Sequence, residues 1–300
     1  MLRDILEGQD AQLRAVLTVI NALDADILLL QGFDYDFDQF ALSTFNQNIA
    51  APYEFLFSRL PNSGMQSGFD LNNDGEIRGA ADAFGYADFA GQGGMAILSR
   101  YPILTAEVSD HSGLLWRDLP GANLPYKDGR PFPSETAHLQ MRLSSVAHWV
   151  VPITLPSIGQ VDLLVWHGNT PVFDGPQDLN GRRGGDETLF WVHYLDGTLG
   201  ERSDLPVIVA GDANIDPSRG EGYHAAISRL MSHPDLQDPH QGSDTVNWVA
   251  TGPMRVDYVL PDSRFTVVDA GVGLPAELVA QDVQNTASRH SVVWVDIALE

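Results

Sequence analysis

The sequence predicts an α/β fold, because helical and strand patterns alternate along the chain. Apolar residues recur at three- and four-residue steps from Leu13 to Leu23, as in an amphipathic helix, and lead into the apolar run ILLL. Residues 207–210, VIVA, have the β-branched composition of a buried strand. A strand over 161–166 precedes a loop and a second helix with an apolar stripe over 189–195.

Composition limits the classes of protein that this chain can represent. Its 300 residues are 44% apolar, which is ample for a packed core, and no linker divides them, so we predict one domain over residues 1–300. The 40 acidic and 17 basic residues give a net charge of −23, which repels nucleic acid and anionic membranes. Cysteine is absent, which excludes disulfides and thiolate metal sites. No apolar run reaches the ~18 residues that span a bilayer, so we expect a soluble monomer with no membrane partner.

The first helix and strand deliver acidic residues to one point. Asp10 is placed to cap the helix, and the following strand ends at Gln31 and Gly32 before the acidic run FDYDFD. Asp34 and Asp36 would share a face with Gly32 if the strand continued. Two interpretations are open, an acidic strand end that contributes to a site and a solvated acidic loop.

Residues 70–82, DLNNDGEIRGAAD, match the front half of a calcium-binding loop. Hard oxygens at alternate positions followed by a glycine suit a wrapped cation. The twelfth position is alanine instead of glutamate, so the loop departs from the EF-hand pattern. We weigh a structural Ca²⁺ site against a plain acidic turn; its ligands would come from Asp70, Asn72, Asp74, Glu76 and Asp82.

The middle of the chain is less informative. Residues 95–99 are predicted to form a strand, and the preceding glycines allow close backbone approach. A proline-rich loop follows, and residues 138–143 alternate as a strand would.

A histidine follows the next buried strand. His167 opens the loop HGNTPVFDGPQDLNGRR, a common placement for a catalytic histidine. Arg182 and Arg183 are adjacent basic residues beside a helix start, so they are candidates for a phosphate contact. The alternative is ordinary pairing with Asp178 or Asp186.

The run PVIVAGDANIDP is the strongest chemical signal. Asp212 and Asn214 stand two residues apart just beyond a buried strand, so in extended geometry both side chains leave the same face. The alternative is an Asx turn, in which these side chains bond their own backbone. Further along, His290 precedes the final strand, where an acid such as Asp257 could orient its imidazole and favour the charged form.

Taken in order, these motifs resemble the endonuclease/exonuclease/phosphatase superfamily of metal-dependent phosphoesterases related to DNase I. The order is a helix, the LLLQ strand end, the histidine strand end, GDAN, RVDY and SRH before the last strand. The resemblance is closest to a bacterial, often exported branch that has FDYD, the acidic glycine loop and PVFDGPQDLNGRR. It implies a four-layer α/β sandwich, in which two packed mixed or antiparallel sheets are flanked by helices.

The resemblance also implies roles for individual residues. Asp212 corresponds to the acid that positions or deprotonates the attacking water, and Asn214 to the amide that orients the reacting group. His290 corresponds to the histidine that binds the scissile phosphate, with Asp257 as its orienting carboxylate. His167 corresponds to a second phosphate-contacting histidine. Mg²⁺ or Mn²⁺ is the implied cofactor.

Three positions depart from the family pattern at the metal site. Gly32 stands where a glutamate is expected, Arg289 stands where an aspartate is expected, and the first strand with its asparagine is missing from this sequence. Asp34 or Asp36 could replace the lost ligand, and Arg289 could pair with Asp212 or Asp34 and neutralise phosphate. A start further upstream would account for the missing strand and would allow an export signal to the periplasm or outside the cell.

Two functional hypotheses follow from these departures. The first is a phosphoesterase with a rebuilt site, acting on a small phosphoester or nucleotide-type substrate in preference to long nucleic acid. The second is a catalytically impaired pseudoenzyme that acts as a binding or scaffold protein.

Overall fold

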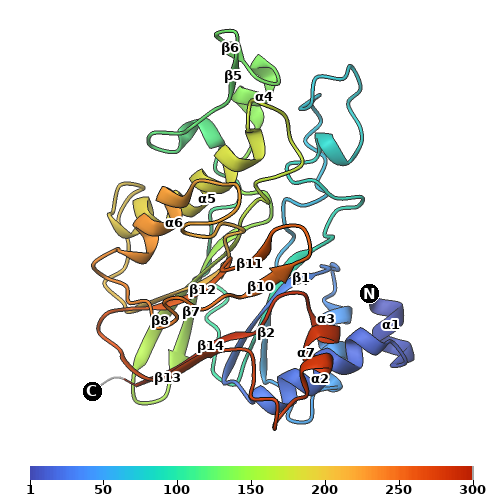
Figure 1. Ribbon diagram of the computed structural model, residues 1–300, viewed down its shortest axis with the longest axis vertical. Helices are drawn as coiled ribbons and strands as arrows, with labels where there is room; N and C mark the ends of the chain where they lie inside the picture. Colours follow the sequence, from blue (N-terminus) through green and yellow to red (C-terminus); the bar gives the residue numbers. More distant parts are fainter. Residues whose placement is uncertain (299–300) are drawn as a thin grey trace.

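Residues 1–298 are described in a computed structural model, which consists of two β-layers packed face to face with helices outside (Figure 1). The helices are α1 (Leu2–Glu7), α2 (Ala11–Leu23), α3 (Phe40–Gln47), α4 (Glu135–Gln140), α5 (Leu179–Leu195), α6 (His224–Met231) and α7 (Gln281–Ala287), with 3₁₀ turns η1 (Ala80–Asp82) and η2 (Trp116–Asp118).

The first β-layer is a five-stranded sheet in the order β12-β9-β8-β7-β4. Strands β8 and β9 are parallel, and the other pairs are antiparallel. Its strands are β4 (Ser109–Asp110), β7 (His148–Leu155), β8 (Gly159–His167), β9 (Val207–Asp212) and β12 (Asp257–Pro261).

The second β-layer is divided into two pieces. One is a three-stranded sheet in the order β1-β3-β2 and the other is the pair β13-β14. Their strands are β1 (Ile27–Phe33), β2 (Phe55–Phe57), β3 (Gly94–Ser99), β13 (Thr266–Val272) and β14 (Val293–Ala298). Two small hairpins complete the fold: β5 (Tyr126–Lys127) with β6 (Arg130–Pro131), and β10 (Val246–Trp248) with β11 (Gly252–Met254).

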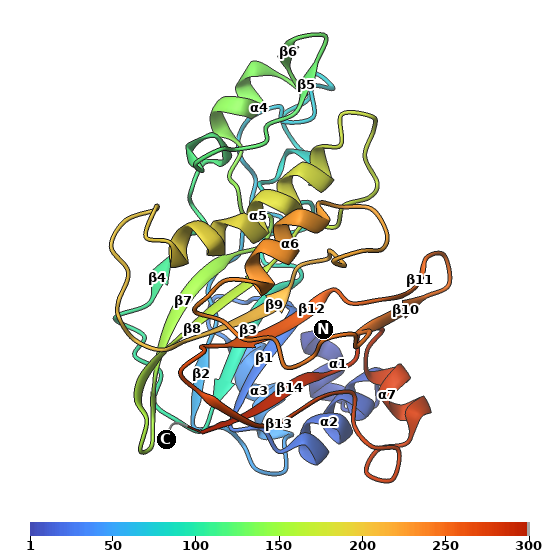
Figure 2. The same ribbon diagram turned by 60° about the vertical axis from the view of Figure 1, so that its left-hand side comes forward.

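Three apolar clusters occupy the three interfaces between layers. One joins α5 and α6 to the outer face of the five-stranded sheet and includes Trp191. A second lies between the two β-layers and includes Trp149. The third packs α1, α2 and α3 on the outer face of β1 and β3 and includes Phe45. The order helix, sheet, sheet, helix confirms the predicted four-layer sandwich (Figure 2).

Local sequence signals account for several element boundaries. Asp10 caps α2, because its carboxylate accepts a hydrogen bond of 2.8 Å from the Leu13 amide. The predicted strand over 138–143 is wrong: residues 135–140 form helix α4, because Ser134 accepts the Ala137 amide and starts a helix. A local cap therefore overrides an alternating pattern that spans only a few residues.

None of the helices in the described part of the chain combines the length and apolarity needed to cross a membrane.

Candidate active site

Sheet register brings three of the predicted site residues together. His167 ends β8 and lies opposite Asp212, the last residue of the parallel strand β9. On the other side of β9, Asp257 begins the antiparallel strand β12 and also lies opposite Asp212. Three polar side chains therefore stand in a row at one end of the five-stranded sheet.

His290 joins this row from the loop before β14. Its Nδ1 lies 2.9 Å from Asp257 Oδ2 and 3.1 Å from Oδ1, so Asp257 is within hydrogen-bond reach, as expected. The same Nδ1 lies 3.9 Å from Asp212 Oδ2, while His167 Nε2 lies 3.8 Å from that oxygen. An isolated bridge between Val246 and His290 attaches the loop to β10. Both histidines therefore face one side of a single buried carboxylate.

The electrostatics of the row follow from burial and from the unequal number of acids and bases. Burial and the neighbouring Asp257 charge raise the pKa of Asp212 to about 8. Burial disfavours the charged form of His290, but the hydrogen bond and charge of Asp257 outweigh it and raise the pKa of His290 to about 9. The site therefore places a cationic imidazole beside a carboxyl that is poised to exchange a proton near neutral pH.

Gln31 orients His167 in a different electrostatic environment. Burial lowers the pKa of His167 to about 4, so this imidazole is neutral. Its Nδ1 lies 3.0 Å from Gln31 Oε1, and Gln31 Nε2 donates to the Trp166 carbonyl at 3.0 Å. Since the amide oxygen accepts, His167 carries its proton on Nδ1 and directs the Nε2 lone pair towards Asp212. The sequence marked Gln31 only as a strand end, and its role follows from the opposing layer.

Asn214 ties two site loops together. Its backbone has a φ of 54°, and its amide donates to Asp212 Oδ1 at 2.7 Å, which is the predicted Asx turn and not an extended strand end. The side-chain Nδ2 donates to the Gly168 carbonyl at 2.9 Å. The turn therefore positions Asp212, and Asn214 holds the loop after β9 against the loop after β8.

A buried glutamate that the sequence analysis did not single out supports the same loop. Glu187 lies on α5 and is fully buried. Its two carboxylate oxygens accept the backbone amides of Ser145 and Asn169, each at 2.5 Å. Trp248 is a second residue that the sequence analysis did not single out. Its ring packs edge-on against the imidazole of His290, with ring centroids 5.8 Å apart. Neither side chain has a motif around it, because both act through residues distant in sequence.

The adjacent arginines have structural roles. Arg183 is buried and donates to four backbone carbonyls, so it has no free face for a substrate; the acceptors are Phe84, Arg142, Leu143 and Ser144. The partly buried Arg182 donates to the Gln177 carbonyl at 3.0 Å and to Asn123 Oδ1 at 2.6 Å. The predicted phosphate contact is therefore not available at Arg183, and Asp186, one of the two alternative partners, instead accepts hydrogen bonds from Trp116 Nε1 and the Asn123 amide.

The predicted replacement ligands after β1 are held by backbone amides. Asp36 accepts from the Phe40 and Ala41 amides at 2.7 and 2.9 Å at the start of α3, while Asp34 accepts from the Gly93 amide at 3.0 Å. Gly32 forms a bulge at a φ of 70°, with open space where a Cβ would stand. Both oxygens of Asp36 are therefore engaged by backbone amides, whereas Asp34 is bonded through Oδ1 only, so a replacement of the glutamate by Asp34 stays a prediction.

Arg289 does not pair as predicted. Its side chain is exposed, and within the described chain it forms no ion pair with Asp212 or Asp34. Its charge acts at a distance, opposing the charged form of the neighbouring His290. Exposure explains the difference, because a hydrated guanidinium gains little from entering a partly buried cleft.

The acidic loop closes on its own backbone. Asp70 accepts the Asp74 and Gly75 amides at 3.1 and 2.9 Å, and Asn72 Nδ2 donates to Asp74 Oδ2 at 2.8 Å. Asp74 also accepts the Glu76 amide at 2.8 Å. The buried Asp82 accepts the Leu71 amide at 2.9 Å, so it anchors the loop to the core. These contacts form a turn without a cation, and calcium binding stays a prediction.

Two carboxylates and one imidazole lie close enough together to hold a divalent ion. Asp212, Asp257 and His290 each offer one ligand atom, all within 4.8 Å of one another, but one of the three is nitrogen. Two of them already hydrogen-bond each other, and Gly32 contributes no side chain. These residues therefore offer mixed oxygen and nitrogen ligands to a divalent ion.

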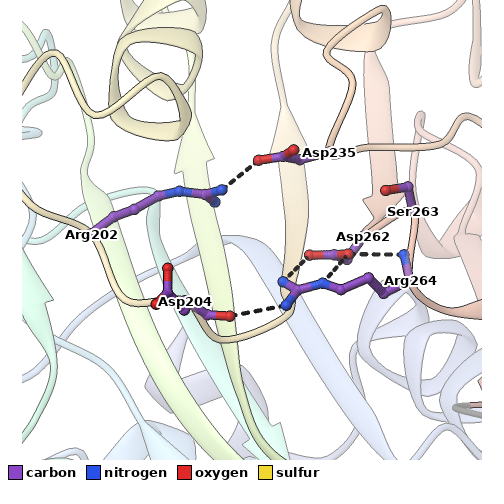
Figure 3. Close-up of a pocket in the computed structure, with 6 residues that line it drawn as sticks. All are labelled: Arg202, Asp204, Asp235, Asp262, Ser263 and Arg264. Carbon is purple, nitrogen blue, oxygen red and sulfur yellow. Dashed lines mark hydrogen bonds and ion pairs between the residues drawn. The ribbon is translucent and has the colours of Figure 1, made fainter.

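A separate cavity of about 280 Å³ lies at the far end of β12 (Figure 3). Both of its arginines are paired with acids: Arg264 pairs with Asp262 at 2.7 Å, and Arg202 pairs with Asp235. It is remote from the histidine row, because Asp257 begins β12 and Asp262 follows its end.

Fold and site together define a phosphoesterase-like α/β sandwich. The chain belongs to the Endonuclease/Exonuclease/phosphatase family, whose model matches residues 6–290. A search of curated protein sequences found no match.

Solved structures share the fold at low sequence identity. An endonuclease/exonuclease/phosphatase from Beutenbergia cavernae DSM 12333 has a TM-score of 0.61 at 18% identity over 97% of this chain, which spans 66% of that structure's length. The human Nocturnin catalytic domain with bound sulfate has a TM-score of 0.57 at 14% identity, covering 97% of this chain and 87% of that one. The mannosyl-6-phosphatase Bt3783 of Bacteroides thetaiotaomicron VPI-5482 has a TM-score of 0.51 at 14% identity, with 99% and 95% covered.

Proposed function

We propose that the chain hydrolyses a phosphoester at the site formed by His167, Asp212, Asp257 and His290. The observation that carries the proposal is the position of Asp212 Oδ2, which lies 3.8 Å from one histidine and 3.9 Å from the other. A phosphate needs a cationic donor, and a hydrolytic water needs a proton acceptor beside it. His290 and Asp212 supply these two groups within one cleft.

Each residue has a task in this mechanism. The charged His290, held by Asp257, donates to a phosphate oxygen and stabilises the charge that builds up in the transition state. Asp212, in its ionised form, accepts a proton from water as the water oxygen attacks phosphorus and the ester oxygen leaves. The neutral His167 accepts a hydrogen bond through Nε2 and orients the water, and Gln31 maintains that tautomer.

Charge argues for a small phosphoester or nucleotide-type substrate. The net charge of −23 repels a polyanion over its whole length, and Arg183, one of the two predicted phosphate-binding arginines, is buried in backbone contacts. A small substrate needs only the local positive charge of His290. Arg289 is exposed next to it and is free to add long-range attraction.

The test is a panel of phosphomonoesters and phosphodiesters assayed with Mg²⁺, Mn²⁺, Ca²⁺ and EDTA. We expect turnover of a small substrate, lost in Asp212→Asn and retained in Asp36→Asn. Because Gly32 and Arg289 stand where the family pattern has a glutamate and an aspartate, we expect little dependence on Mg²⁺. Strong turnover that requires Mg²⁺ and disappears with EDTA would overturn this account of the metal site.

A second function is favoured by the state of β1 and Arg289. Gly32 offers no ligand, and both carboxylate oxygens of Asp36 are engaged by backbone amides. A protein with this site could bind a phosphoester without hydrolysing it, as a pseudoenzyme. Binding of a nonhydrolysable phosphodiester that requires His290, combined with absence of turnover over the whole panel, would select this alternative.

A further inference from the structure

The start of β12, which carries Asp257, lies at an edge of the five-stranded sheet, because β12 is the terminal strand in the sheet order. On the inner side of the strand, the Val256 carbonyl accepts the Ala213 amide at 2.8 Å. The N–H of Asp257 belongs to the same trans peptide as that carbonyl, so it points away from β9 and towards the edge. A backbone amide that is taken out of water at such an edge needs an acceptor from outside the sheet.

Thr245 supplies this acceptor. Its Oγ1 accepts the Asp257 amide at 3.1 Å and the Val256 amide at 3.0 Å. The residue is fully buried, so both hydrogen bonds lie away from bulk water, where they are electrostatically stronger. A hydroxyl 12 positions earlier in the sequence therefore fixes the backbone that carries Asp257.

The main chain of Thr245 holds His290, the hydrogen-bond partner of that aspartate. Its carbonyl accepts the Ser291 amide at 2.7 Å, and the next residue, Val246, forms a bridge with His290. Strand β10 starts at Val246, and its Trp248 packs on the imidazole (Figure 2). Thr245 thus holds one member of the pair through its side chain and the other through its main chain.

Both contacts act on one hydrogen bond between distant segments. His290 Nδ1 lies 2.9 Å from Asp257 Oδ2, although the two residues are 33 positions apart in the sequence. In residues 1–298, β12 and β14 belong to different sheets, so strand pairing between them does not set this distance. A small shift of either segment would take the two atoms out of hydrogen-bonding range. The contacts of Thr245 oppose such a shift from both sides.

We propose that Thr245 is a positioning residue, which sets the distance between the Asp257 carboxylate and the His290 imidazole. Because it is fully buried, it acts through these two residues and does not contact substrate. Its kinetic effect rests on the proposed phosphoester hydrolysis, in which the charged His290 donates to a phosphate oxygen. Serine at this position keeps the accepting oxygen, whereas valine keeps the branched shape and removes the oxygen.

The first test reads the contact itself and needs no turnover. In protein labelled with ¹⁵N-histidine, the proton that His290 Nδ1 donates to Asp257 should give a downfield N–H signal that exchanges slowly with water. Loss of the signal in His290→Gln identifies it. We expect the signal in the unmodified chain and in Thr245→Ser. In Thr245→Val its exchange should be at least about tenfold faster, because the pair opens more often.

The second test is kinetic. Thr245→Val should lower kcat by about tenfold or more, since displacement of a group that acts on the transition state has effects of this size. The change in KM should be smaller, because the contact of His290 with phosphate strengthens as charge builds up in the transition state. Thr245→Ser should recover most of the lost kcat.

Ser99→Ala is the matched control, because Ser99 is also fully buried and its Oγ accepts the Tyr101 amide at 2.9 Å. Ser99 pairs with Ile27 at the opposite end of β1 from Gln31, the residue that faces the site. The variant should lower the melting temperature but leave the His290 signal and kcat unchanged. A purely structural role of Thr245 would give this same pattern in Thr245→Val.

An unchanged His290 signal in folded Thr245→Val would overturn the proposal, whatever the activity. Absence of the signal from the unmodified chain would also overturn it, because there would be no persistent contact to position. Absence of turnover in the unmodified chain would instead overturn the proposed function, and the signal would still decide the role of Thr245. If Thr245→Val does not fold, Thr245→Ala replaces it with the same expected and contrary results, since the space that it opens admits a water to the two amides.

Discussion

The two β-layers each carry half of the candidate site, and only one of the layers is complete. The five-stranded sheet is continuous and supplies His167, Asp212 and Asp257 from adjacent strands in register. The divided layer supplies Gln31, Gly32 and the loop with Arg289 and His290, and its two pieces are not hydrogen-bonded to each other. Gly32 and Arg289, the two residues that differ from the expected metal-site pattern, therefore lie in the same layer as the break between the two pieces.

This difference shows that strand pairing on both sides fixes the position of a site residue. In the complete sheet, moving Asp212 would require displacement of its neighbours on both sides, so the acidic centre is fixed by the whole ladder. In the divided layer, Gly32 occupies a bulge at a free edge, and Arg289 is exposed. Substitutions there disturb few packed neighbours, which explains how the site could depart from its family on one side only.

The largest expected effect comes from Asp212→Asn, which acts in the complete layer. It should lower kcat by about 10³-fold, within the range for loss of a general base. The melting temperature should stay the same or rise, because burial already disfavours the charged form of this carboxyl. Steady-state kinetics and calorimetric melting measure the two effects.

Asp36→Asn is the matched control for this prediction, since Asp36 accepts two amides at the start of α3 in the divided layer and an amide oxygen preserves one of these hydrogen bonds. Its activity should equal that of the unmodified chain. Equal activity in Asp212→Asn and the unmodified chain would show that Asp212 is not the general base.

The next largest effect is the contribution of His148 to the pH dependence of stability. His148 is the first residue of β7 in the five-stranded sheet. Burial lowers the pKa of His148 from 6.5 to about 3. Below pH 6.5, His148 is therefore protonated in the unfolded chain but stays neutral in the folded chain. The free energy of unfolding falls as pH falls. One pH unit corresponds to about 1.4 kcal/mol, so His148 should cost about 2 kcal/mol between pH 6.5 and 5.

Urea unfolding of the chain and of His148→Gln across this pH range measures that contribution. The free energy of unfolding should depend less steeply on pH in the variant. Parallel curves for the two proteins would show that His148 is not buried in its neutral form.

A smaller effect is expected from rebuilding the divided layer with Gly32→Glu and Arg289→Asp together. The two carboxylates should raise Mg²⁺ affinity by about tenfold, since they add hard oxygen ligands. The left-handed backbone at Gly32 should cost about 1–2 kcal/mol of stability for any L side chain. Titration calorimetry with Mg²⁺ compares the double variant with each single one, and no gain in affinity over the single variants would argue against a shared ion site.

The smallest effect is expected at the acidic loop of residues 70–82, which belongs to neither β-layer. Calcium at ten times its dissociation constant should raise the melting temperature by about 2–4 °C, because it binds the folded loop only. Asp74→Ala should abolish the rise. An unchanged melting curve in millimolar calcium would leave a self-bonded turn, which the contacts of Asp70 and Asn72 already form.

The sequence by itself determined the fold class, the strands around Asp212 and the family, because apolar periodicity and short motifs are local properties. It could indicate that Asp257 would orient His290, since residue types and their order suffice for that. It could not indicate that Arg183 donates to four backbone carbonyls, that Asp36 caps a helix, or that Gln31 orients His167 from the opposing layer. Those outcomes depend on which backbone groups lack partners after packing, and only the tertiary structure decides that.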